Sequence, residues 1–328
     1  MVAWVVTWAA ALAAACAAPR YDRGKSADVA RPGFARPVAA PQPAGNPYTP
    51  AKAALGRALF FDPRLSADGR VACATCHDPA HGWSDGRRVA VGVHGRPGTR
   101  RTPTLWNVAW APVLFADGRA ASLEAQALVP VQAAHEMGLS LDSLVARLAA
   151  VPAYRTAFGV AFPEHPRVTP EQVARALAVF QRTLVAPEAP FDRWVAGDTA
   201  AIAPPARRGF ALFVGKARCA ACHAGWAFTD GRFHDVGLPD ADRGRGAVTG
   251  RAREAHAFRT PTLRDVAGRG PYMHDGSLPT LGAVVRHYQH GVRRGAGRAR
   301  DVPRIALTPA EEADLLAFLA TLSADAGR

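Results

Sequence analysis

The chain has 328 residues, which is enough for two domains with separate cores, and 49% of its residues are hydrophobic. Its formal net charge is +13, and nearly all of the basic residues are arginines. These residues are not interleaved with aromatic side chains, so the sequence argues against nucleic-acid binding. A solvated basic surface is the simpler explanation of the charge, and a face that attracts an acidic redox partner is the alternative.

Residues 1–18 are predicted to be an export signal. The apolar run from Val2 to Ala15 is too short to span a bilayer as a mature helix. Residues 12–16 loosely match a lipoprotein cleavage site, so lipidation of Cys16 is an alternative to ordinary cleavage nearby. Either route leads to the periplasm, with the protein free or held at the membrane by a lipid anchor. Residues 19–46, rich in proline and alanine, are predicted to be a flexible linker.

Two copies of the motif C-x-x-C-H carry the clearest chemical signal. They consist of Cys73, Cys76 and His77 in the first half and Cys219, Cys222 and His223 in the second. Two thiols one helical turn apart can each form a thioether with a haem vinyl group, and the histidine that follows can bind the iron. A zinc site would need further cysteine ligands, and a redox C-x-x-C would need a thioredoxin-like setting. The sequence has neither, and it therefore predicts two covalently bound haem c groups.

Helical periodicity and capping residues predict an all-α fold. Helices are expected over residues 52–61, 122–135, 140–149, 170–185, 204–214, 280–290 and 309–322. A repeat links the two halves: residues 101–109 return as residues 259–267 at an offset of 158, and an Asp-Gly pair follows 16 positions after each start. We therefore expect two cytochrome c-like haem domains related by internal duplication, over residues 47–198 and 199–328.

The same offset predicts that the two haem irons differ. It places Pro130 opposite Tyr288, whose phenol shares a helical face with Leu281 and Val285. Tyr288 is therefore a candidate sixth ligand of the second iron. Because proline offers no side-chain donor, the first haem is expected to be open on its distal side.

Two polar residues occur near the expected open site. Gln126 stands where the second half has Val284, and Glu136 stands where it has Arg294. A carboxylate over the iron can take a proton from peroxide and return it to the departing oxygen. The alternatives are a packed polar residue for Gln126 and a solvated helix-end carboxylate for Glu136. Their joint occurrence in the half without a sixth ligand favours Glu136, Gln126 and Pro130 as the distal set of a catalytic haem.

The chain resembles the bacterial di-haem cytochrome c peroxidase family, which includes the MauG enzymes. The resemblance covers residues 47–322 and rests on both haem motifs and on residues 55–66, 117–119, 123–126, 190–193 and 271–276. It implies peroxide reduction at the N-terminal haem and electron entry at the C-terminal haem. It also implies the distal set that the repeat indicates independently.

The second haem departs from the usual pattern of that family. Members typically use methionine as its sixth ligand, and the matching position here is Tyr288, as in the MauG branch. A phenolate donor lowers the iron potential, which argues against easy electron uptake from a high-potential cytochrome. Met273, His274, His287 and His290 remain rival ligands.

Other departures lie between the haems and in a loop. The family usually has a tryptophan electron relay where this chain has Ala116, so Trp106 or Trp110 would have to serve instead. Arg101 replaces the asparagine of an inter-haem calcium site, so its guanidinium either repels the metal or substitutes for its charge. His94, near the family's capping histidine, either caps the first iron or lies exposed. The histidines expected to be structural are His81, His135, His234 and His256, with His234 also a candidate partner of a haem propionate.

These observations predict an exported di-haem peroxidase that reduces hydrogen peroxide with electrons from a small cytochrome c or cupredoxin. One alternative is a MauG-like enzyme that uses peroxide to oxidise side chains of a partner protein, and Tyr288 favours it. Another is a non-catalytic di-haem electron carrier, against which Pro130 argues because it leaves the first iron without a side-chain ligand. A homodimer is an alternative to a monomer.

Overall fold

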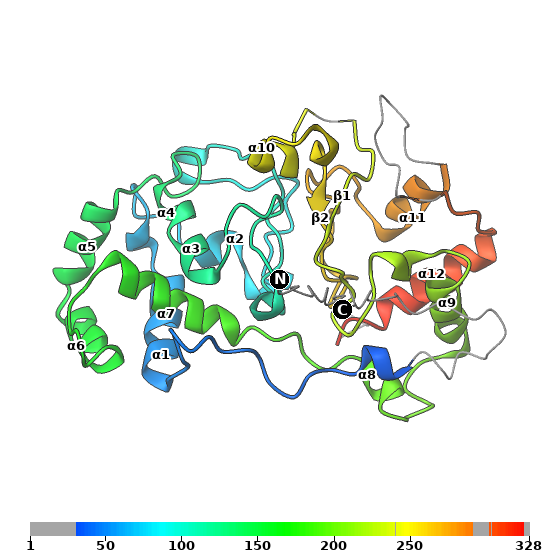
Figure 1. Cartoon of the computed structure of the whole chain (residues 1–328), viewed down its shortest axis with the longest axis horizontal. Helices are drawn as coiled ribbons and strands as arrows, with labels where there is room; N and C mark the ends of the chain where they lie inside the picture. The colour runs from blue at the N-terminus through cyan, green and yellow to red at the C-terminus, as the bar shows by residue number, and fades with distance from the viewer. Residues whose placement is uncertain (1–30, 240, 291–301, 303, 325–328) are drawn as a thin grey trace, which may run out of the picture.

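The computed structural model describes residues 31–239, 241–290, 302 and 304–324, which form two lobes lying side by side (Figure 1). The first lobe contains α1 (Pro50–Phe60), α2 (Cys73–Cys76), α3 (Leu123–Ala127), α4 (Val129–Gln132), α5 (Leu141–Ala149), α6 (Pro152–Ala161) and α7 (Pro170–Arg182). The second lobe and its boundary with the first contain α8 (Pro190–Val195), α9 (Pro204–Val214), β1 (Phe233–His234), α10 (Arg245–Thr249), β2 (Phe258–Arg259), α11 (Leu281–His290) and α12 (Pro309–Ala320). Within these described ranges, no helix is long and apolar enough to cross a membrane.

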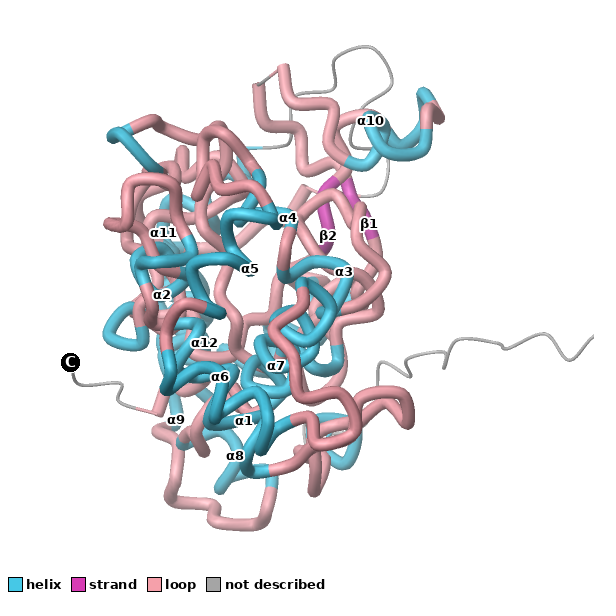
Figure 2. Tube along the Cα trace, turned by 90° about the vertical axis from the view of Figure 1, so that its left-hand side faces the viewer, coloured by secondary structure: helices cyan, strands magenta, loops and turns pink. Residues whose placement is uncertain are grey.

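The regular structure is mostly helical, and long loops join the helices (Figure 2). β1 and β2 form a short antiparallel pair, with Phe233 opposite Arg259 and His234 opposite Phe258. The fold class is therefore consistent with the all-α prediction, and this pair is a small local addition to it.

The core of the first lobe forms where α1 crosses α7. Thr49 caps α1 by accepting a hydrogen bond from the Lys52 amide (3.2 Å), and Pro50 occupies the first turn. Gly56 lies at the crossing, where a Cβ atom would overlap the carbonyl group of Ala176. Glycine is thus required for the two backbones to approach this closely. Buried apolar side chains around the crossing include Leu55, Leu59, Val173 and Leu177.

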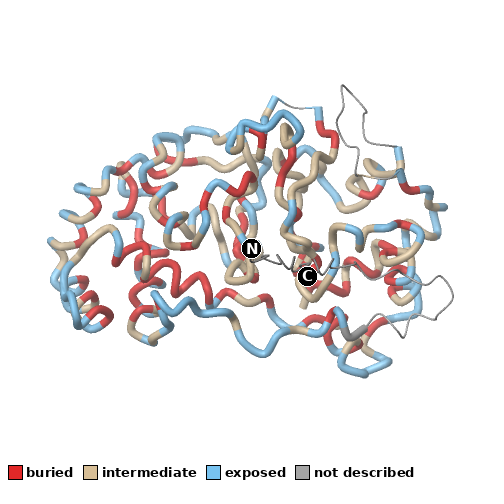
Figure 3. The backbone as a smooth tube through the Cα atoms, viewed as in Figure 1, coloured by how far each residue is buried: buried red, intermediate tan, exposed pale blue. Residues whose placement is uncertain are grey.

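The second lobe repeats this arrangement where α9 crosses α12. Gly209 lies at that crossing, and a Cβ atom there would overlap the carbonyl group of Asp314. Thr308 caps α12 by accepting from the Glu311 amide (3.3 Å), as the Thr-Pro sequence predicts. Figure 3 shows buried residues gathered along both crossings.

Equivalent hydrogen bonds hold the loops beside the two C-x-x-C-H motifs. The Thr104 hydroxyl donates to the Gly82 carbonyl at 2.6 Å, and the Thr262 hydroxyl, 158 positions later, donates to the Ala227 carbonyl at 2.6 Å. A second matched pair joins Ser84 to the Thr102 carbonyl and Thr229 to the Thr260 carbonyl. The sequence repeat therefore marks positions with the same local structure.

The helix expected over residues 122–135 is two short helices, α3 and α4, separated at Leu128. Pro130 explains the break, because it has no amide hydrogen to donate to the Gln126 carbonyl one turn earlier. The expectation of one continuous helix is thereby corrected, and Gln126 and Pro130 lie on two successive helices. Helices α6, α8 and α10 were not predicted.

α8 lies within the range expected for the first domain, but its side chains pack in the second core. Phe191 and Trp194 are 0% and 2% exposed, and both belong to the cluster that contains Phe210 and Phe318. The second core therefore begins before residue 198.

Residues 34–46, called the strap below, differ from the expected flexible linker. Phe34 is buried in the second core, while Asn46 is buried in the first lobe, where its side-chain amide donates to Glu124 (2.7 Å). Figure 1 shows the strap, in blue, running along one edge of the molecule from α8 to α1. The difference arises because its few large side chains find partners on both lobes, which composition alone does not reveal.

Candidate functional site

The first C-x-x-C-H motif forms α2 and the residue after it. The His77 amide donates to the Cys73 carbonyl at 2.8 Å, which holds the cysteines and the histidine in one tight turn. Both thiols are half-buried, and neither forms a disulfide bond. Burial raises the pKa of Cys73 to about 12 and that of Cys76 to about 11, so both remain protonated until they react.

The second motif has the same closure, although Cys219–Ala221 is a 3₁₀ turn. The His223 amide donates to the Cys219 carbonyl at 2.9 Å. Burial raises the pKa of Cys219 to about 12. The two motifs thus present the same donor set from similar backbone turns.

Both motif histidines are oriented by a backbone carbonyl. His77 Nδ1 lies 3.1 Å from the Trp83 oxygen, and His223 Nδ1 lies 2.9 Å from the Phe228 oxygen. A carbonyl can only accept, so Nδ1 carries the hydrogen and Nε2 keeps its lone pair for a metal. Burial lowers the pKa of both imidazoles, which favours the neutral form that binds iron. These residues fit haem c: the cysteines would hold the porphyrin and the histidines would bind its iron.

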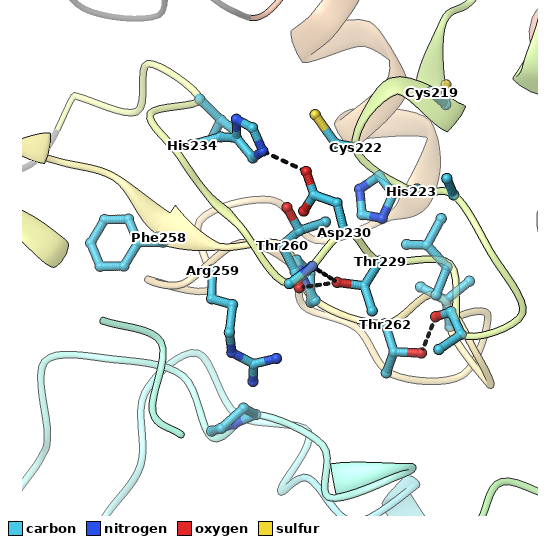
Figure 4. A pocket seen from close by; sticks show the side chains of 18 of the residues that line it. Cys219, Cys222, His223, Thr229, Asp230, His234, Phe258, Arg259, Thr260 and Thr262 are labelled. Carbon is cyan, nitrogen blue, oxygen red and sulfur yellow. Dashed lines mark hydrogen bonds and ion pairs between the residues drawn. The ribbon is translucent and has the colours of Figure 1, made fainter. Parts of the chain in front are cut away.

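A cavity of about 680 Å³ borders the second motif (Figure 4). Cys219, Cys222 and His223 line it, as do Tyr288 and Met273. α11 supplies further lining through Leu281 and Val284, which confirms that these residues face the same space as Tyr288. The size and the largely apolar lining suit a flat, apolar prosthetic group.

The rival ligands of the second site are placed differently. Met273 and His274 line the cavity, and the His274 ring stacks on Phe258 at 3.5 Å between centroids. His287 Nε2 lies 2.9 Å from the Val236 oxygen, and the exposed His290 lies 2.7 Å from the Arg286 oxygen. Of the four rivals to Tyr288, Met273 and His274 therefore line the cavity with it, whereas His287 and His290 are not among the lining residues.

Burial and the nearby Cys219 and Cys222 raise the pKa of the Tyr288 phenol. A buried phenol ionises only when a cation lies close by, because the low dielectric penalises an isolated negative charge. A ferric haem iron in the same cavity is such a cation.

Glu136 lies within electrostatic range of the first motif, and its charge adds to burial in raising the pKa of Cys73 and Cys76. Burial raises the pKa of the Glu136 carboxyl itself, while His135 and Arg119 oppose this shift. His135 Nε2 lies 3.7 Å from Glu136 Oε1 on the solvent side. The Glu136 side chain is thus half-buried, with 34% of it exposed.

The backbone around Glu136 is fixed by the loop at residues 91–93. The Val93 amide donates to the Glu136 carbonyl at 2.8 Å, and a Cβ atom on Gly92 would overlap that carbonyl. Cys76 Sγ lies 3.9 Å from the Val91 oxygen on the same loop. One loop therefore touches both the haem attachment site and the candidate acid–base residue.

Pro130 lies near Glu136, whereas Gln126 lies on the preceding helix. The Pro130 carbonyl accepts from the Met137 amide at 3.2 Å, which ties α4 to the turn that carries Glu136. Gln126 is half-buried on α3, whose start is capped by Ser122. His94 is exposed, with its amide bonded to Asp68 (3.2 Å), so the described conformation does not place it as a cap.

Arg101 donates hydrogen bonds to backbone carbonyls at the boundary between the lobes. Its guanidinium donates to the carbonyls of Thr102 (3.2 Å) and Arg269, and its amide donates to the His274 carbonyl (2.7 Å). Burial and the neighbouring Arg101 lower the pKa of Arg269 to about 10. Two guanidinium groups beside these carbonyls do not suit a calcium site.

Trp106 and Trp110 both contact residues of the second half. Trp83, which orients His77, packs edge-on against Trp106 at 6.0 Å, and the Trp106 indole donates to Asp265 at 2.9 Å. Trp110 packs edge-on against Trp226 at 4.7 Å. Sequence reasoning missed both Trp226 and Asp265, although Asp265 stands within the repeat at residues 259–267 and Trp226 lies three positions after His223.

Cys222, Asp230 and His234 lie close enough together to hold a metal ion. His234 Nε2 is 2.9 Å from Asp230 Oδ2, and Figure 4 shows this contact beside Cys222. Cys222 is committed to haem by its motif, so we infer no separate metal there.

Two cytochrome c-like lobes, each with paired thiols and an oriented histidine, define a c-type cytochrome with two haem sites. A family model described as di-haem cytochrome c peroxidase matches residues 50–200, and one described as cytochrome c matches residues 206–323. The chain belongs to the di-haem cytochrome c peroxidase family, and it is a peroxidase-type oxidoreductase whose two cytochrome c domains imply haem c.

Individual relatives agree with this assignment. The chain is 51% identical to methylamine utilization protein MauG of Methylorubrum extorquens, over 89% of this chain and 84% of that protein. It is 38% identical to cytochrome-c peroxidase IdrP1 of Denitromonas iodatirespirans, over 96% of this chain and 92% of that protein. The solved structure of a MauG-like protein associated with microbial copper homeostasis matches with a TM-score of 0.82 and 31% identity, covering 93% of this chain and 96% of that one.

Proposed function

We propose that the protein reduces hydrogen peroxide in its first domain, with Glu136 handling the protons, and that a partner protein supplies electrons through the second domain. The observation that carries this proposal is the position of Glu136, which is half-buried and whose carbonyl is hydrogen-bonded to the loop that contacts Cys76. Pro130, in the adjoining helix, has no side-chain donor to close the iron. This combination favours a reactive haem over an electron-storing one.

Haem c at Cys73, Cys76 and His77 would supply the vacant iron position and the electrons for breaking the peroxide bond. Reduction of hydrogen peroxide consumes two electrons and two protons and releases two waters. Glu136 would accept the proton of one peroxide oxygen and donate it to the other, which leaves as water. The raised pKa of Glu136 suits this role, because it makes the ionised carboxylate a stronger base toward the proton of peroxide. The Gln126 amide would orient the peroxide.

Glu136→Gln tests the assignment, because the amide fills the same space without acting as a base. We expect peroxide turnover to fall by about 10²–10⁴-fold, with unchanged haem content and reduced-state spectra. Glu164→Gln, at an exposed position of the same lobe, is the matched control. Full turnover in the Glu136 variant would reject the proposal.

At the second site, we propose that His223 and Tyr288 bind the iron, with Met273 as the rival to Tyr288. Electrons would pass between the sites through Trp106 or Trp110, in place of the relay missing at Ala116. The contacts of these tryptophans with Trp83 and Trp226 support this route.

The electron source distinguishes two versions of the function. In one, a small cytochrome c or cupredoxin donates; in the other, side chains of a partner protein are oxidised, as in a MauG-like enzyme. The place of Tyr288 in the second cavity and the 51% identity to a MauG protein favour the second version. Steady-state peroxide turnover with reduced cytochrome c separates them, since negligible turnover is expected of the MauG-like version. A non-catalytic electron carrier predicts no reaction with peroxide at all.

Several coarser expectations complete the proposal. Matched crossings and hydrogen bonds support an origin by internal duplication, with domain ranges near 47–198 and 199–328. We propose that Arg101 takes the place of the inter-haem calcium ion. We propose export to the periplasm from residues 1–18, with lipidation of Cys16 as an alternative to ordinary cleavage. These residues lie outside the described part of the structure. A homodimer is a separate proposal, with a monomer as its alternative.

A further inference from the structure

The carbonyl that orients His223 belongs to Phe228, a fully buried residue with a positive φ of 53°. The packing of the Phe228 ring is one of the contacts that hold this oxygen in place, beside the hydrogen bonds of the turn. Phe213 and Phe318 contact the ring from within the second lobe, at 5.8 and 6.1 Å between centroids. Any further side chain that packs against the Phe228 ring therefore also helps to position His223.

The equivalent turn of the first site is held differently. Trp83, with a φ of 59°, orients His77, and its ring packs against Phe60 at 5.8 Å and Phe180 at 6.1 Å. Both rings come from α1 and α7 of the same lobe. The first histidine is therefore positioned by its own domain.

At the second site a ring from outside the domain takes part. Phe34, at the start of the strap, lies 5.1 Å from the Phe228 ring, 5.9 Å from Phe191 and 5.4 Å from Phe210. It is only 7% exposed, so it is a full member of the cluster. Aromatic contacts of this kind add to the stability gained from burial alone.

Arg36 fixes the strap two residues later. Its guanidinium donates to Asp192 Oδ2 (3.2 Å) and to the carbonyls of Pro187 (2.8 Å) and Ala186. The other oxygen of Asp192 accepts from Arg264 at 2.6 Å, and the Arg264 guanidinium lies 5.1 Å from the Phe228 ring centroid. The strap thus reaches Phe228 by two routes, one apolar and one ionic.

The far end of the strap is held by the first lobe. Asn46 donates to Glu124 of α3 (2.7 Å) and to the Arg175 carbonyl of α7 (3.0 Å). α3 is the helix that carries Gln126. A single segment therefore joins the helix that carries Gln126, the proposed distal residue of the first site, to the residues behind the second.

We propose that the strap is a positioning element for the second haem site, in which Phe34 acts through Phe228 on His223. The inference rests on the proposed role of His223 as an iron ligand. Without the Phe34 ring, water would reach the cluster behind His223 and the hydrogen bond to its Nδ1 would lose its fixed geometry. Histidine orientation and local polarity both tune the potential of a haem iron.

Spectroelectrochemistry of the full di-haem protein tests this inference. In Phe34→Ala we expect the midpoint potential of the second haem to become more negative, because admitted water stabilises the ferric charge. Phe34→Leu should restore most of the wild-type value, and Arg36→Gln should shift it less, in the same direction. Val38→Ala is the control, since Val38 lies on the strap and is fully exposed. The first haem serves as an internal reference that should not move.

The outcomes separate this inference from the assignment of the site. Electron paramagnetic resonance of the wild-type ferric protein first establishes histidine ligation of the second haem, and its failure would overturn the assignment itself. If ligation holds but Phe34→Ala matches Val38→Ala in potential and only melts earlier, the strap is merely structural. If Phe34→Ala cannot be isolated with its haems, an unshifted potential in Arg36→Gln overturns the inference instead.

Discussion

Tyr288 and Tyr272 both border the cavity at the second motif, but their phenols are held differently. The Tyr272 hydroxyl donates to the carbonyls of Val266 (2.9 Å) and Ala267 (3.1 Å). Tyr288 packs beside Cys219 and Cys222, and burial raises the pKa of its phenol. Only Tyr288 therefore combines access to the haem side of the cavity with a hydroxyl that a metal would stabilise as an anion.

Replacing Tyr288 with phenylalanine should change the second haem and leave the first intact. Loss of a phenolate donor should raise the midpoint potential of the second haem and alter its electron paramagnetic resonance spectrum. Tyr272→Phe is the matched control and should only lower stability, by about 1 kcal/mol for the lost hydrogen bond. A Tyr288→Phe spectrum identical to that of wild type would point to Met273 as the ligand.

The raised pKa of Glu136 also predicts a pH dependence of stability. A carboxyl whose folded-state pKa lies above its unfolded value binds more protons when folded, so its ionisation lowers stability as pH rises through that interval. Glu136→Gln removes this cost. The variant should melt later than wild type at pH 7.5, and the difference should vanish below the ordinary glutamate pKa of about 4.3. A constant difference at all pH values would contradict the shift.

The two helix crossings are the elements on which each lobe depends. Gly209 allows the α9 backbone to approach Asp314 of α12, so Gly209→Ala should force the helices apart and cost about 1–3 kcal/mol of unfolding free energy. Gly159→Ala on α6 is the control, because a Cβ atom there meets only Pro166 at 3.9 Å. That substitution should be neutral or stabilising by up to about 1 kcal/mol. Denaturant unfolding of the haem-loaded variants measures both effects, and equal stabilities would contradict the crossing argument.

At the scale of elements, the sequence predicts best those features that depend on residues close together in the chain. The C-x-x-C-H motifs, the Thr-Pro starts at residues 169 and 308 and the repeat at Arg101 each depend on neighbouring residues, and the structure forms them as expected. The break at Leu128 was missed because helical periodicity outweighed the effect of Pro130. The packing of Phe34 and the tryptophan contacts depend on residues far apart in the chain. No local pattern of the sequence therefore predicts either of them.

At the scale of the molecule, the two lobes are joined by polar contacts in addition to the strap. Arg100 of the first lobe pairs with Asp242 at 2.7 Å and with Asp117 at 2.6 Å, and Arg245 donates to the Asp117 and Gly118 carbonyls. A fixed distance between haem sites requires such a boundary, because electron transfer through side chains is sensitive to separation. Arg101 also contributes to this boundary, through its hydrogen bonds to the Arg269 and His274 carbonyls.

Calcium removal should therefore leave this protein unchanged. Because the Arg101 guanidinium already satisfies the Thr102 and Arg269 carbonyls, we expect no calcium binding by calorimetry and no change in melting temperature with a chelator. Arg101→Asn removes the charge and frees these oxygens beside Asp85, so added calcium should now bind and raise the melting temperature. Arg155→Asn, an exposed change of the same charge on α6, should show neither effect. If the wild-type protein binds calcium and a chelator lowers its melting temperature, Arg101 does not take the place of the metal.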